Sequence, residues 1–407
     1  MNYENIKIYE LFAGIGSQYK ACKNIASELN VNFVSLGACE WYIDAIIAYM
    51  KIHYDSVLPE SDLNKDEMVN LLNKFTFSAD SKKEVNKAYF TRMNEQRLRS
   101  IFPYLFGFVN YEYFSKKWDK SKIENRGGGH EFHSFTNIKD IQILPKDIDI
   151  LTYSFPCQDI SQQGNQKGIT KQTRSGLLYE VERILKSNKD RLPNVLLLEN
   201  VKALASKKFI NQFQDWISSL SELGYKSVWK VVNSVDYGSV QNRERVFCVS
   251  YLANNDFDFP KTVKSFKKLE NIIFNNSEMK NCNDLLRYFH NNFSETKNQI
   301  VKTKLLDYTN FNSEAYVYLP TKLGPTLTAS GANARLKFYF EKTNELKIMS
   351  SKQAFLYMGF TENDYFKAKE GNLISEQKLI FLCGNSISVE VLESIFRQVI
   401  KCNLVKA

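Results

Sequence analysis

The sequence is poor in the residues that interrupt regular structure or cross-link a chain. Of its 407 residues, 17 are glycine, 8 are proline and 4 are histidine, whereas lysine, asparagine, isoleucine, phenylalanine and tyrosine are abundant. We interpret this bias as the composition of an AT-rich genome. The cysteines number seven, an odd count, and no pair has C-x-x-C spacing. This pattern argues against a disulfide framework and a cysteine-type zinc site, and it is typical of a reducing cytosol.

The chain also lacks a long apolar run. No stretch approaches the roughly 18 residues that a membrane-spanning helix needs, so we expect no membrane association. Residues Met1–Asn5 show no basic region followed by an apolar stretch, so we expect no secretory signal. Hydrophobic residues still make up 43% and aromatic residues 14% of the chain. This content is enough for a packed core and argues against a disordered chain.

Positive charge exceeds negative charge moderately. Lysine and arginine number 54 against 45 aspartate and glutamate, which gives a formal net charge of +9. The excess is concentrated between Lys82 and Arg126, with eleven basic and five acidic residues. Such charge suits a polyanionic partner, and a solvated surface is the alternative interpretation. The length favours two domains, or one large domain with insertions.

The first half of the sequence alternates short apolar runs with amphipathic stretches. The expected strands are Ile6–Phe12, Phe33–Cys39, Ile148–Tyr153, Val195–Leu198 and Arg245–Ser250, and the expected helices include Ser17–Leu29, Ser175–Leu185 and Asn211–Leu223. This alternation predicts a doubly wound, mostly parallel α/β sheet with helices on both faces. Ligands of such sheets bind at the carboxyl ends of the strands.

Two stretches interrupt the alternation and indicate domain boundaries. A polar, basic and partly helical insertion is expected at about 51–135, within a first domain of residues 1–254. A second, smaller domain is expected at 255–374, where the alternation is missing and aromatic residues are scattered. Residues 375–407 are expected to form a segment that returns to the first domain.

The first expected strand runs into a glycine-containing turn, Phe12-Ala13-Gly14-Ile15-Gly16-Ser17. Glycines let a backbone turn tightly and approach a ligand closely. Glu40 lies 24 residues after Gly16, where a carboxylate suits a ribose diol, and Trp41 could pack on a purine. Tyr19 replaces the third glycine of the dinucleotide fingerprint, which favours an adenosine cofactor without phosphates, such as S-adenosylmethionine. A plain structural turn is the alternative.

Three further segments carry reactive side chains near strand ends. Pro156-Cys157-Gln158 follows the third expected strand, and a cysteine there is placed for nucleophilic chemistry. Glu199 follows the buried run Val195–Leu198 and could serve as an acid. Arg243 and Arg245 would share a face of an extended segment and suit a phosphate or a base carbonyl. The alternatives are a buried apolar cysteine, a helix-capping carboxylate and a surface charge cluster.

In their order along the chain, these segments resemble the DNA (cytosine-5) methyltransferases, in particular the CpG-methylating members from wall-less bacteria. The matching segments are Phe12–Ser17, Glu40-Trp41, Pro156-Cys157-Gln158, Glu199-Asn200-Val201, Gln241–Arg245 and Gly384-Asn385-Ser386. Lys139-Asp140-Ile141 resembles the family motif that meets the adenine, and Thr326-Leu327 resembles the pair that closes the target-recognition region. The resemblance covers nearly the whole chain, with one departure: Gln353 stands where glutamate is common.

The resemblance implies a role for each of these residues. Cys157 would add to C6 of a flipped-out cytosine, Glu199 would hold N3 and the amino group, and Arg243 and Arg245 would bind O2 and a nearby phosphate. S-adenosylmethionine, released as S-adenosylhomocysteine, would contact Phe12, Ala13, Gly14, Gly16, Ser17, Glu40, Trp41, Asp140, Ile141, Pro156, Asn385 and Ser386. DNA would contact Ser161, Gln162, Gln163, Arg174, Gln241, Thr326, Ser330 and Arg335.

The resemblance also implies what each domain does. Residues 1–254 would be the catalytic and cofactor-binding domain, and residues 255–374 the target-recognition domain, where 311–316 and 326–335 resemble recognition loops for CpG. We expect a monomer that methylates double-stranded DNA in the bacterial cytoplasm, and a separate cognate restriction endonuclease is compatible with the sequence. We expect no metal, because His130 and His133 have no further ligands nearby.

Three other functions remain as alternatives. A tRNA cytosine methyltransferase would have a short recognition region and typically a Cys-Phe-Thr tripeptide, and neither is found. A non-catalytic DNA-binding regulator would normally lose Pro156-Cys157-Gln158 or Glu199-Asn200-Val201, and both are intact. A nicotinamide oxidoreductase would need the missing third glycine and a phosphate cradle.

Overall fold

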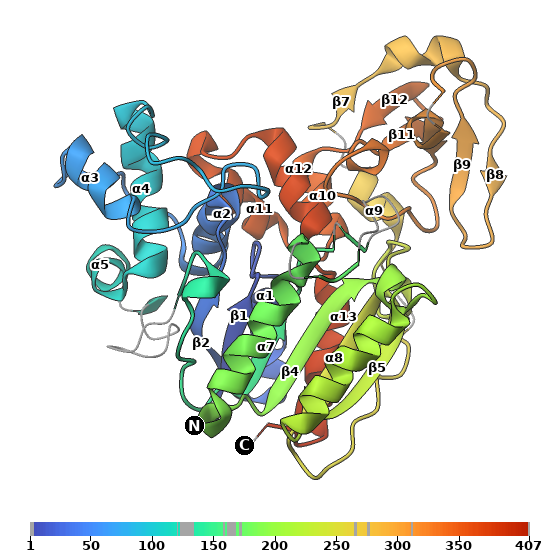
Figure 1. Cartoon of the computed structure of the whole chain (residues 1–407). Coiled ribbons are helices and arrows are strands. Elements are labelled where there is room, and N and C mark those ends of the chain that lie inside the picture. Colours follow the sequence, from blue (N-terminus) through green and yellow to red (C-terminus); the bar gives the residue numbers. More distant parts are fainter. Residues whose placement is uncertain are drawn as a thin grey trace. The chain divides into compact units, whose positions relative to one another are not determined.

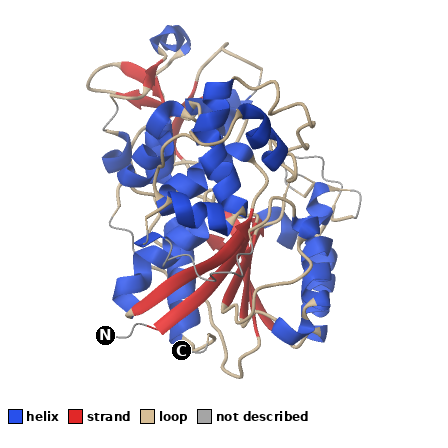
Figure 2. Cartoon of the chain, turned by 90° about the vertical axis from the view of Figure 1, so that its left-hand side faces the viewer, coloured by secondary structure: helices blue, strands red, loops and turns tan. Residues whose placement is uncertain are grey.

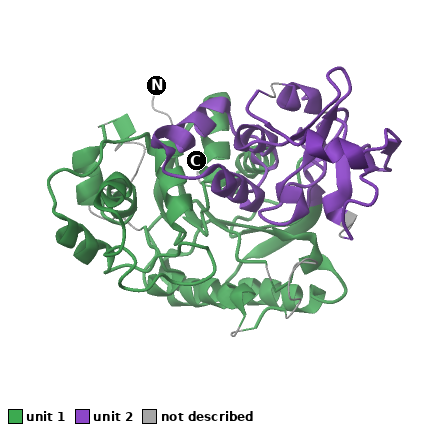
Figure 3. Cartoon of the chain, turned by 90° about the horizontal axis from the view of Figure 1, so that it is seen from above, with its two compact units in different colours: residues 1–231, 245–260, 392–407 green, residues 232–244, 261–391 purple. Residues whose placement is uncertain are grey.

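The computed structural model describes residues 4–119, 121–122, 134–157, 159–160, 168–170, 173–263, 267–274, 277–310 and 312–405. The chain forms two units (Figure 3). Unit 1 consists of Met1–Val231, Arg245–Pro260 and Leu392–Ala407, and unit 2 consists of Val232–Glu244 and Lys261–Val391. The units describe packing and not activity, so the functional domains at 1–254, 255–374 and 375–407 stay a prediction.

A six-stranded sheet is the centre of unit 1 (Figure 1). Its order is β2-β1-β3-β4-β6-β5, with β1 (Glu4–Leu11), β2 (Val31–Cys39), β3 (Ile150–Tyr153), β4 (Val195–Val201), β5 (Lys226–Asn233) and β6 (Glu244–Tyr251). Strands β1 to β4 are parallel, whereas β6 is antiparallel to β4. The expected α/β fold is confirmed. The edge strand β5 is absent from the expected strands, because exposed lysines interrupt its apolar pattern.

The register of the sheet brings several strand ends to one level. Leu11 in β1 lies opposite Cys39 in β2 and Tyr153 in β3. Tyr153 in turn lies opposite Leu198 in β4. The segments that follow β1, β2, β3 and the buried part of β4 therefore leave the sheet at the same edge, which is where a parallel sheet binds its ligands.

Helices cover both faces of this sheet (Figure 2). On one face lie α7 (Leu178–Ser187) and α8 (Ile210–Glu222), whose apolar side chains join the core formed by β1, β3 and β4. The expected helices at Ser175–Leu185 and Asn211–Leu223 are confirmed to within a few residues. The 3-10 turn η2 (Arg174–Leu177) precedes α7 and accounts for the earlier expected start.

The other helical layer includes the first and last helices of unit 1. α1 is Ser17–Leu29, as expected from the sequence. The final helix, α13 (Val389–Lys401), contributes its residues from Leu392 onward to unit 1. Polar contacts join α1 to this part of α13: Asn24 Nδ2 donates to Glu393 at 2.7 Å, and Arg397 Nε donates to Glu28 at 2.9 Å.

The expected insertion is partly helical, as predicted. Its helices are α3 (Lys65–Leu72), α4 (Glu95–Val109) and α5 (Tyr111–Lys117), and they follow α2 (Ile43–Tyr54). The side chains of Asn64, Asn94 and Asn110 accept hydrogen bonds from the first turns of α3, α4 and α5. Aromatic contacts then join α4 to α5, since Phe102 and Phe106 both pack against Tyr113.

Unit 2 contains a second six-stranded sheet, built from short strands, and a group of helices. The sheet order is β7-β12-β11-β10-β9-β8, with β7 (Lys280–Asn281), β8 (Ser294–Glu295), β9 (Val301–Lys304), β10 (Tyr316–Tyr318), β11 (Lys337–Phe340) and β12 (Glu345–Ile348). Its helices are α9 (Leu269–Ile273), α10 (Ser351–Tyr357), α11 (Glu362–Lys369) and α12 (Glu376–Asn385). A small apolar core around Val317, Tyr339 and Leu346 holds the sheet together.

One segment corrects the expectation that no apolar run reaches the length of a membrane span. Glu376–Lys401 passes a test of length and composition, with a mean hydropathy of 1.6 over 18 residues. The sequence analysis did not find it because polar residues interrupt the run, whereas the mean averages over them. In the structure 72% of this window is buried, as in a core helix of a globular protein, so the segment is weak support for a membrane span.

Candidate active site

The turn between β1 and α1 has a backbone that few residues adopt. Phe12, Gly14 and Gly16 all have left-handed conformations, with φ of 58°, 56° and 74°. A bulky residue such as phenylalanine is rarely found there, so the surrounding structure must hold the turn in place. A Cβ atom on Gly14 would meet no described atom within 4 Å, whereas one on Gly16 would lie 2.2 Å from His53 Nε2. The turn is therefore packed on one side and open on the other.

Glu40 fastens this turn to the end of β2. Its carboxylate accepts hydrogen bonds from the backbone N–H groups of Gly14 at 2.8 Å, Trp41 at 2.9 Å and Tyr42 at 2.8 Å. Burial raises the pKa of Glu40, and the three N–H donors act against that shift. Glu40 thus holds the glycine turn in place. The sequence predicted that Glu40 and this turn both bind the cofactor, but it did not predict a contact between them.

Asp140 and Ile141 lie on a turn that also belongs to this end of the sheet. Asp140 ends the 3-10 helix η1 (Ile138–Asp140) and is exposed, whereas Ile141 is buried. Burial and the negative charges of Glu40 and Asp140 raise the pKa of the Cys39 thiol. The two predicted cofactor carboxylates are therefore both close to the end of β2.

The segment after β3 carries the predicted nucleophile. Cys157 is partly exposed and packs against the core of unit 1. The adjoining backbone is held from two sides: Ser175 Oγ donates to Pro156 O at 2.7 Å, and Asn200 Nδ2 donates to Phe155 O at 3.0 Å. Cys157 thus stands on a braced loop at the ligand-binding edge of the sheet.

Glu199 forms an ion pair with an arginine of the neighbouring strand β6. Glu199 is 8% exposed and lies in β4, beyond the point where β3 ends. Arg245 Nε of β6 lies 3.3 Å from Glu199 Oε1. Since Tyr153 at the end of β3 lies opposite Leu198 in β4, the loop of Cys157 leaves the sheet at the level where Glu199 follows Leu198 in β4. The sequence analysis placed Arg245 near the site but did not predict its pairing with Glu199.

Arg174, a predicted DNA contact, is turned inward in this structure. Its guanidinium donates to the backbone oxygen of Ser81 in the insertion. Burial lowers the pKa of Arg174, and the nearby Asp159, Asp80 and Cys157 act against that shift. The sequence did not indicate this contact between Arg174 and the insertion.

Arg243 has a different environment from Arg245. It is 4% exposed, and its guanidinium donates to the backbone oxygens of Leu327 at 2.8 Å, Gly384 at 3.2 Å and Ser386 at 2.8 Å. These contacts join the 326–335 loop to the end of α12 within unit 2. This structural part was not expected from the sequence, and the contact of Arg243 with the base stays a prediction.

Gln241 and Thr326 hold the same loop. Gln241 is buried, accepts a hydrogen bond from Leu327 N at 2.9 Å and donates to Tyr357 O at 3.3 Å. Thr326 donates its hydroxyl to the backbone oxygen of Asn242. Both residues are engaged within unit 2, so they shape the predicted recognition loop, and their contact with DNA stays a prediction.

The remaining predicted DNA residues are unevenly placed. Ser330 O accepts the hydroxyl of Thr328 at 2.8 Å, and Arg335 forms an ion pair with Glu314 in the other predicted recognition loop. Ser161, Gln162 and Gln163, together with Gln158, lie outside the described residues. The same is true of His130 and His133, and no group of three potential metal ligands occurs in the part of the chain that the structure describes.

Asn385 and Ser386 lie at the end of α12, where Ser386 is the C-terminal cap. Among the described residues, Ser386 Oγ is a buried atom that has no hydrogen-bond partner. The cost of burying a hydroxyl without a partner points to an absent polar ligand. Gln353, the one departure from the family pattern, accepts the hydroxyl of Ser350 at the start of α10.

A buried acid beneath the glycine turn is a further polar group that sequence reasoning missed. Glu10 in β1 accepts hydrogen bonds from Tyr49 OH at 2.7 Å and Tyr19 N at 3.2 Å. Burial raises the pKa of Glu10 to about 7, against the effect of these two hydrogen bonds. Beside it, His53 Nε2 lies 3.1 Å from Ile15 O. The available signal was an acid between Tyr9 and Leu11, near the end of an expected strand.

The chain has an α/β fold that solved methyltransferases share. Solved structures with the same fold include the Entamoeba histolytica methyltransferase EhMeth, with a TM-score of 0.58, 13% identity and 98% of both chains covered. Another is the S. pombe Dnmt2 methyltransferase, with a TM-score of 0.54, 14% identity, and coverage of 98% of this chain and 99% of that one.

Sequence comparison defines the class more closely. A family model of C-5 cytosine-specific DNA methylases matches residues 109–401. The chain is 40% identical to the orphan methyltransferase M.SssI of Spiroplasma monobiae, over 97% of both chains. It is 29% identical to the type II methyltransferase M2.ScrFI of Lactococcus lactis subsp. cremoris, over 97% of this chain and 99% of that one. The chain belongs to the C-5 cytosine-specific DNA methylase family and is a DNA (cytosine-5)-methyltransferase.

Proposed function

We propose that this enzyme transfers a methyl group from S-adenosylmethionine to C5 of a flipped-out cytosine in CpG, through a covalent bond between Cys157 and C6. The observation that carries the proposal is the arrangement at the edge of the unit 1 sheet. Cys157 follows β3, and Glu199, which forms an ion pair with Arg245 of β6, lies near the carboxyl end of the neighbouring β4. A nucleophile beside a carboxylate and a guanidinium is the set of groups that addition to a cytosine ring requires.

The residues of the cofactor region fit an adenosine cofactor without phosphates. The turn of Phe12, Gly14 and Gly16 is open on the Gly14 side, where an added Cβ would meet no described atom within 4 Å. The buried Ser386 hydroxyl has no partner among the described residues, as a ligand-binding hydroxyl would in the absence of its ligand. We propose that Phe12, Ala13, Gly14, Gly16, Ser17, Glu40, Trp41, Asp140, Ile141, Pro156, Asn385 and Ser386 hold S-adenosylmethionine, which leaves as S-adenosylhomocysteine.

The chemistry at the cytosine follows from the side chains. The thiolate of Cys157 forms a bond to C6, and the electrons of the C5–C6 double bond make C5 nucleophilic. Glu199, held by Arg245, shares a proton with N3 and so stabilises the negative charge that addition places on the ring. When bound, S-adenosylmethionine supplies an electrophilic methyl group next to C5. A base, which we take to be water, then removes the C5 proton, and the Cys157–C6 bond breaks.

The substrate must present its base outside the double helix, because C5 and C6 are inaccessible in stacked DNA. We propose that Arg243 and Arg245 bind O2 and a nearby phosphate, and that DNA contacts come from Ser161, Gln162, Gln163, Arg174, Gln241, Thr326, Ser330 and Arg335. Recognition of CpG is proposed from the resemblance of 311–316 and 326–335 to CpG recognition loops. We further propose that the enzyme acts as a monomer in the bacterial cytoplasm, with or without a separate cognate endonuclease.

The experiment is bisulfite sequencing of a mixed-sequence plasmid after incubation with the purified enzyme and S-adenosylmethionine. We expect protection from conversion at every CG and at no other cytosine. Protection at another motif would keep the chemistry and remove the CpG assignment. A Cys157→Ser variant is the matched control, and it should give no protection and no SDS-stable adduct with DNA that carries 5-fluorocytosine. Normal protection by this variant would remove Cys157 from the mechanism.

A further inference from the structure

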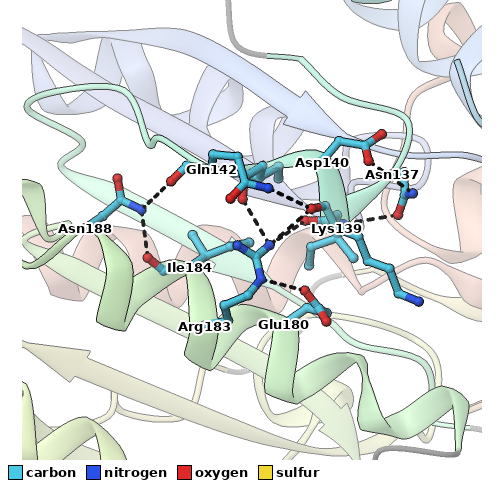
Figure 4. Close-up of polar contacts among 10 residues, drawn as sticks. Asn137, Lys139, Asp140, Gln142, Glu180, Arg183, Ile184 and Asn188 are labelled. Atoms are coloured by element: carbon cyan, nitrogen blue, oxygen red, sulfur yellow. Dashed lines mark hydrogen bonds and ion pairs between the residues drawn. The ribbon is translucent and has the colours of Figure 1, made fainter. Parts of the chain in front are cut away.

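We propose that Arg183 is a positioning residue for the cofactor, because it holds the turn that presents Asp140 and Ile141. Arg183 lies on α7 and points toward this turn (Figure 4). Its Nη2 donates to the backbone oxygens of Ile138 at 3.3 Å, Lys139 at 3.4 Å and Ile141 at 3.0 Å. The inference rests on the proposed function, since it assumes that this turn binds the cofactor.

The buried side chains of Ile138 and Ile141 anchor the turn in the core, but its own hydrogen bonds do little to fix the direction of Asp140. Asp140 is exposed, and its carboxylate accepts a long hydrogen bond of 3.4 Å from Asn137 Nδ2. Within the turn, Asp140 N donates to Asn137 O at 3.0 Å and Ile141 N donates to Ile138 O at 3.3 Å. The one guanidinium reaches the backbone oxygens of three residues of this turn, of which Lys139 O also accepts from Gln142 Nε2 at 3.3 Å, so the direction of Asp140 depends in large part on Arg183.

A second residue of the same helical region fastens the far end of the segment. Asn188, which caps α7, accepts a hydrogen bond from Leu144 N at 2.9 Å and donates to Gln142 O at 3.0 Å. It also donates to Ile184 O at 2.8 Å, which ties it to α7 itself. The segment from Ile138 to Leu144 is thus attached to α7 at both ends (Figure 4).

The chemistry of the side chain explains why an arginine suits this position. A guanidinium has five N–H donors in a planar fork, so it can hold several carbonyl oxygens while a carboxylate fixes its orientation. Here Nε donates to Glu180 Oε2 at 2.8 Å, one turn earlier on α7. A lysine would offer a single charged nitrogen and could not keep both sets of contacts.

The start of the same helical region reaches the loop of the nucleophile. Ser175 in η2, directly before α7, donates its hydroxyl to Pro156 O at 2.7 Å, and its N–H donates to Asp159 Oδ2 at 3.2 Å. One continuous element therefore braces the Cys157 loop at its start and the Asp140 turn further along. Arg183 braces the Asp140 turn and makes none of these contacts with the Cys157 loop.

The test measures S-adenosylhomocysteine binding by calorimetry for the wild type, Arg183→Ala, Arg183→Lys and the control Lys186→Ala. Lys186 forms an exposed i,i+4 ion pair with Glu182 on the same helix. We expect Arg183→Ala to weaken binding about tenfold, as loss of one charged hydrogen bond would. Arg183→Lys should be intermediate, and Lys186→Ala should bind like the wild type. The KM for S-adenosylmethionine should rise while kcat and DNA affinity change little.

Hydrogen exchange of the apo protein supplies a readout that is independent of the cofactor. The amides of residues 138–144 should exchange faster in Arg183→Ala, while those of β3 and β4 keep their protection. If Arg183→Ala leaves both the exchange rates and the binding of S-adenosylhomocysteine unaltered, the inference is overturned. It is also overturned if this variant loses DNA affinity and thermal stability to the same degree as it loses cofactor binding. If the wild type itself binds no S-adenosylhomocysteine, it is the proposed function that fails.

Discussion

Arg245 Nε lies 3.3 Å from Glu199 Oε1, and the two side chains are only 18% and 10% exposed. The pair exists because β6 runs antiparallel to β4, which places Arg245 opposite Val201, two residues beyond Glu199. A carboxylate of such low exposure needs a partner to remain charged. Arg245 therefore helps to orient the carboxyl group that is proposed to act on N3 of the cytosine.

The first prediction concerns this pair. Glu199→Gln keeps the size of the side chain but removes its charge and its ability to share a proton with the base. We expect methyl transfer to fall by a factor of roughly 10² to 10⁴, the usual contribution of a general acid or base. Single-turnover transfer of a labelled methyl group is the measurement, with Glu182→Gln, a partly exposed residue of α7 paired with Lys186, as the control. A Glu199→Gln enzyme with wild-type turnover would show that the carboxylate has no part in the reaction.

The second prediction concerns the glycine turn. In Gly16→Ala the new Cβ would lie 2.2 Å from His53 Nε2 and 2.7 Å from the Tyr49 ring, at a φ of +74°. We expect a loss of stability and a weaker affinity for S-adenosylhomocysteine, measured by thermal unfolding and calorimetry. Gly238→Ala is the control for the backbone alone, since it has a φ of +95° and no described atom within 4 Å. Its cost should be about 1 kcal/mol.

Equal effects of the two glycine variants would contradict the second prediction. In that case backbone strain, which both positions share, would account for the whole loss. The collision with His53 and Tyr49 would then have been relieved by a small movement of those side chains.

The third prediction concerns Arg243. Arg243→Ala leaves the buried carbonyl groups of Leu327, Gly384 and Ser386 without their donor. Because each buried acceptor without a partner costs about 1–3 kcal/mol, we expect a loss of roughly 3 kcal/mol or more in the free energy of unfolding. Urea unfolding measures this loss, and Arg287→Ala, which removes an exposed arginine stacked on Tyr288, should cost far less. Similar unfolding midpoints for the two variants would show that the carbonyl contacts contribute little.

The fourth prediction concerns pH. Burial raises the pKa of Glu10 from an ordinary value of 4.5 to about 7, so folding favours its protonated form. Its contribution to stability is fully present below about pH 4.5 and is lost as the pH rises through about 7, a change of about 3 kcal/mol. Glu10→Gln has no proton to lose there. The difference in the free energy of unfolding between the wild type and Glu10→Gln should therefore shift in favour of the variant between pH 5.5 and pH 8.

Chemical unfolding at the two pH values measures that difference, and subtraction of the variant removes the contribution of the histidines and other groups. A constant difference between the two proteins at both pH values would show that Glu10 is ionised in the folded protein throughout this range, as it is in the unfolded chain. The carboxylate would then be stabilised more strongly than its hydrogen bonds with Tyr49 and Tyr19 indicate.

By itself, the sequence determined the alternation of strands and helices and the ends of the strands that carry Cys157 and Glu40. These features follow from local rules, because the apolar period of a segment reports which face it buries. The helix Ser17–Leu29 is an example, since its predicted and observed bounds agree. The sequence did not predict the edge strand β5, because an edge strand is partly solvated and therefore lacks a regular apolar pattern.

Only the tertiary structure decided which side chains meet. Arg243 reaches Gly384 across 141 residues of sequence, and Arg183 reaches Ile141 across 42 residues. Such pairs depend on the order of strands and on where each crossover helix returns, and no local pattern encodes these. The acid of Glu10 shows the same limit, since its raised pKa comes from burial beneath α1 and α2 rather than from its neighbours in the chain. Local chemistry thus predicted which groups are reactive, whereas packing determined which residues they contact.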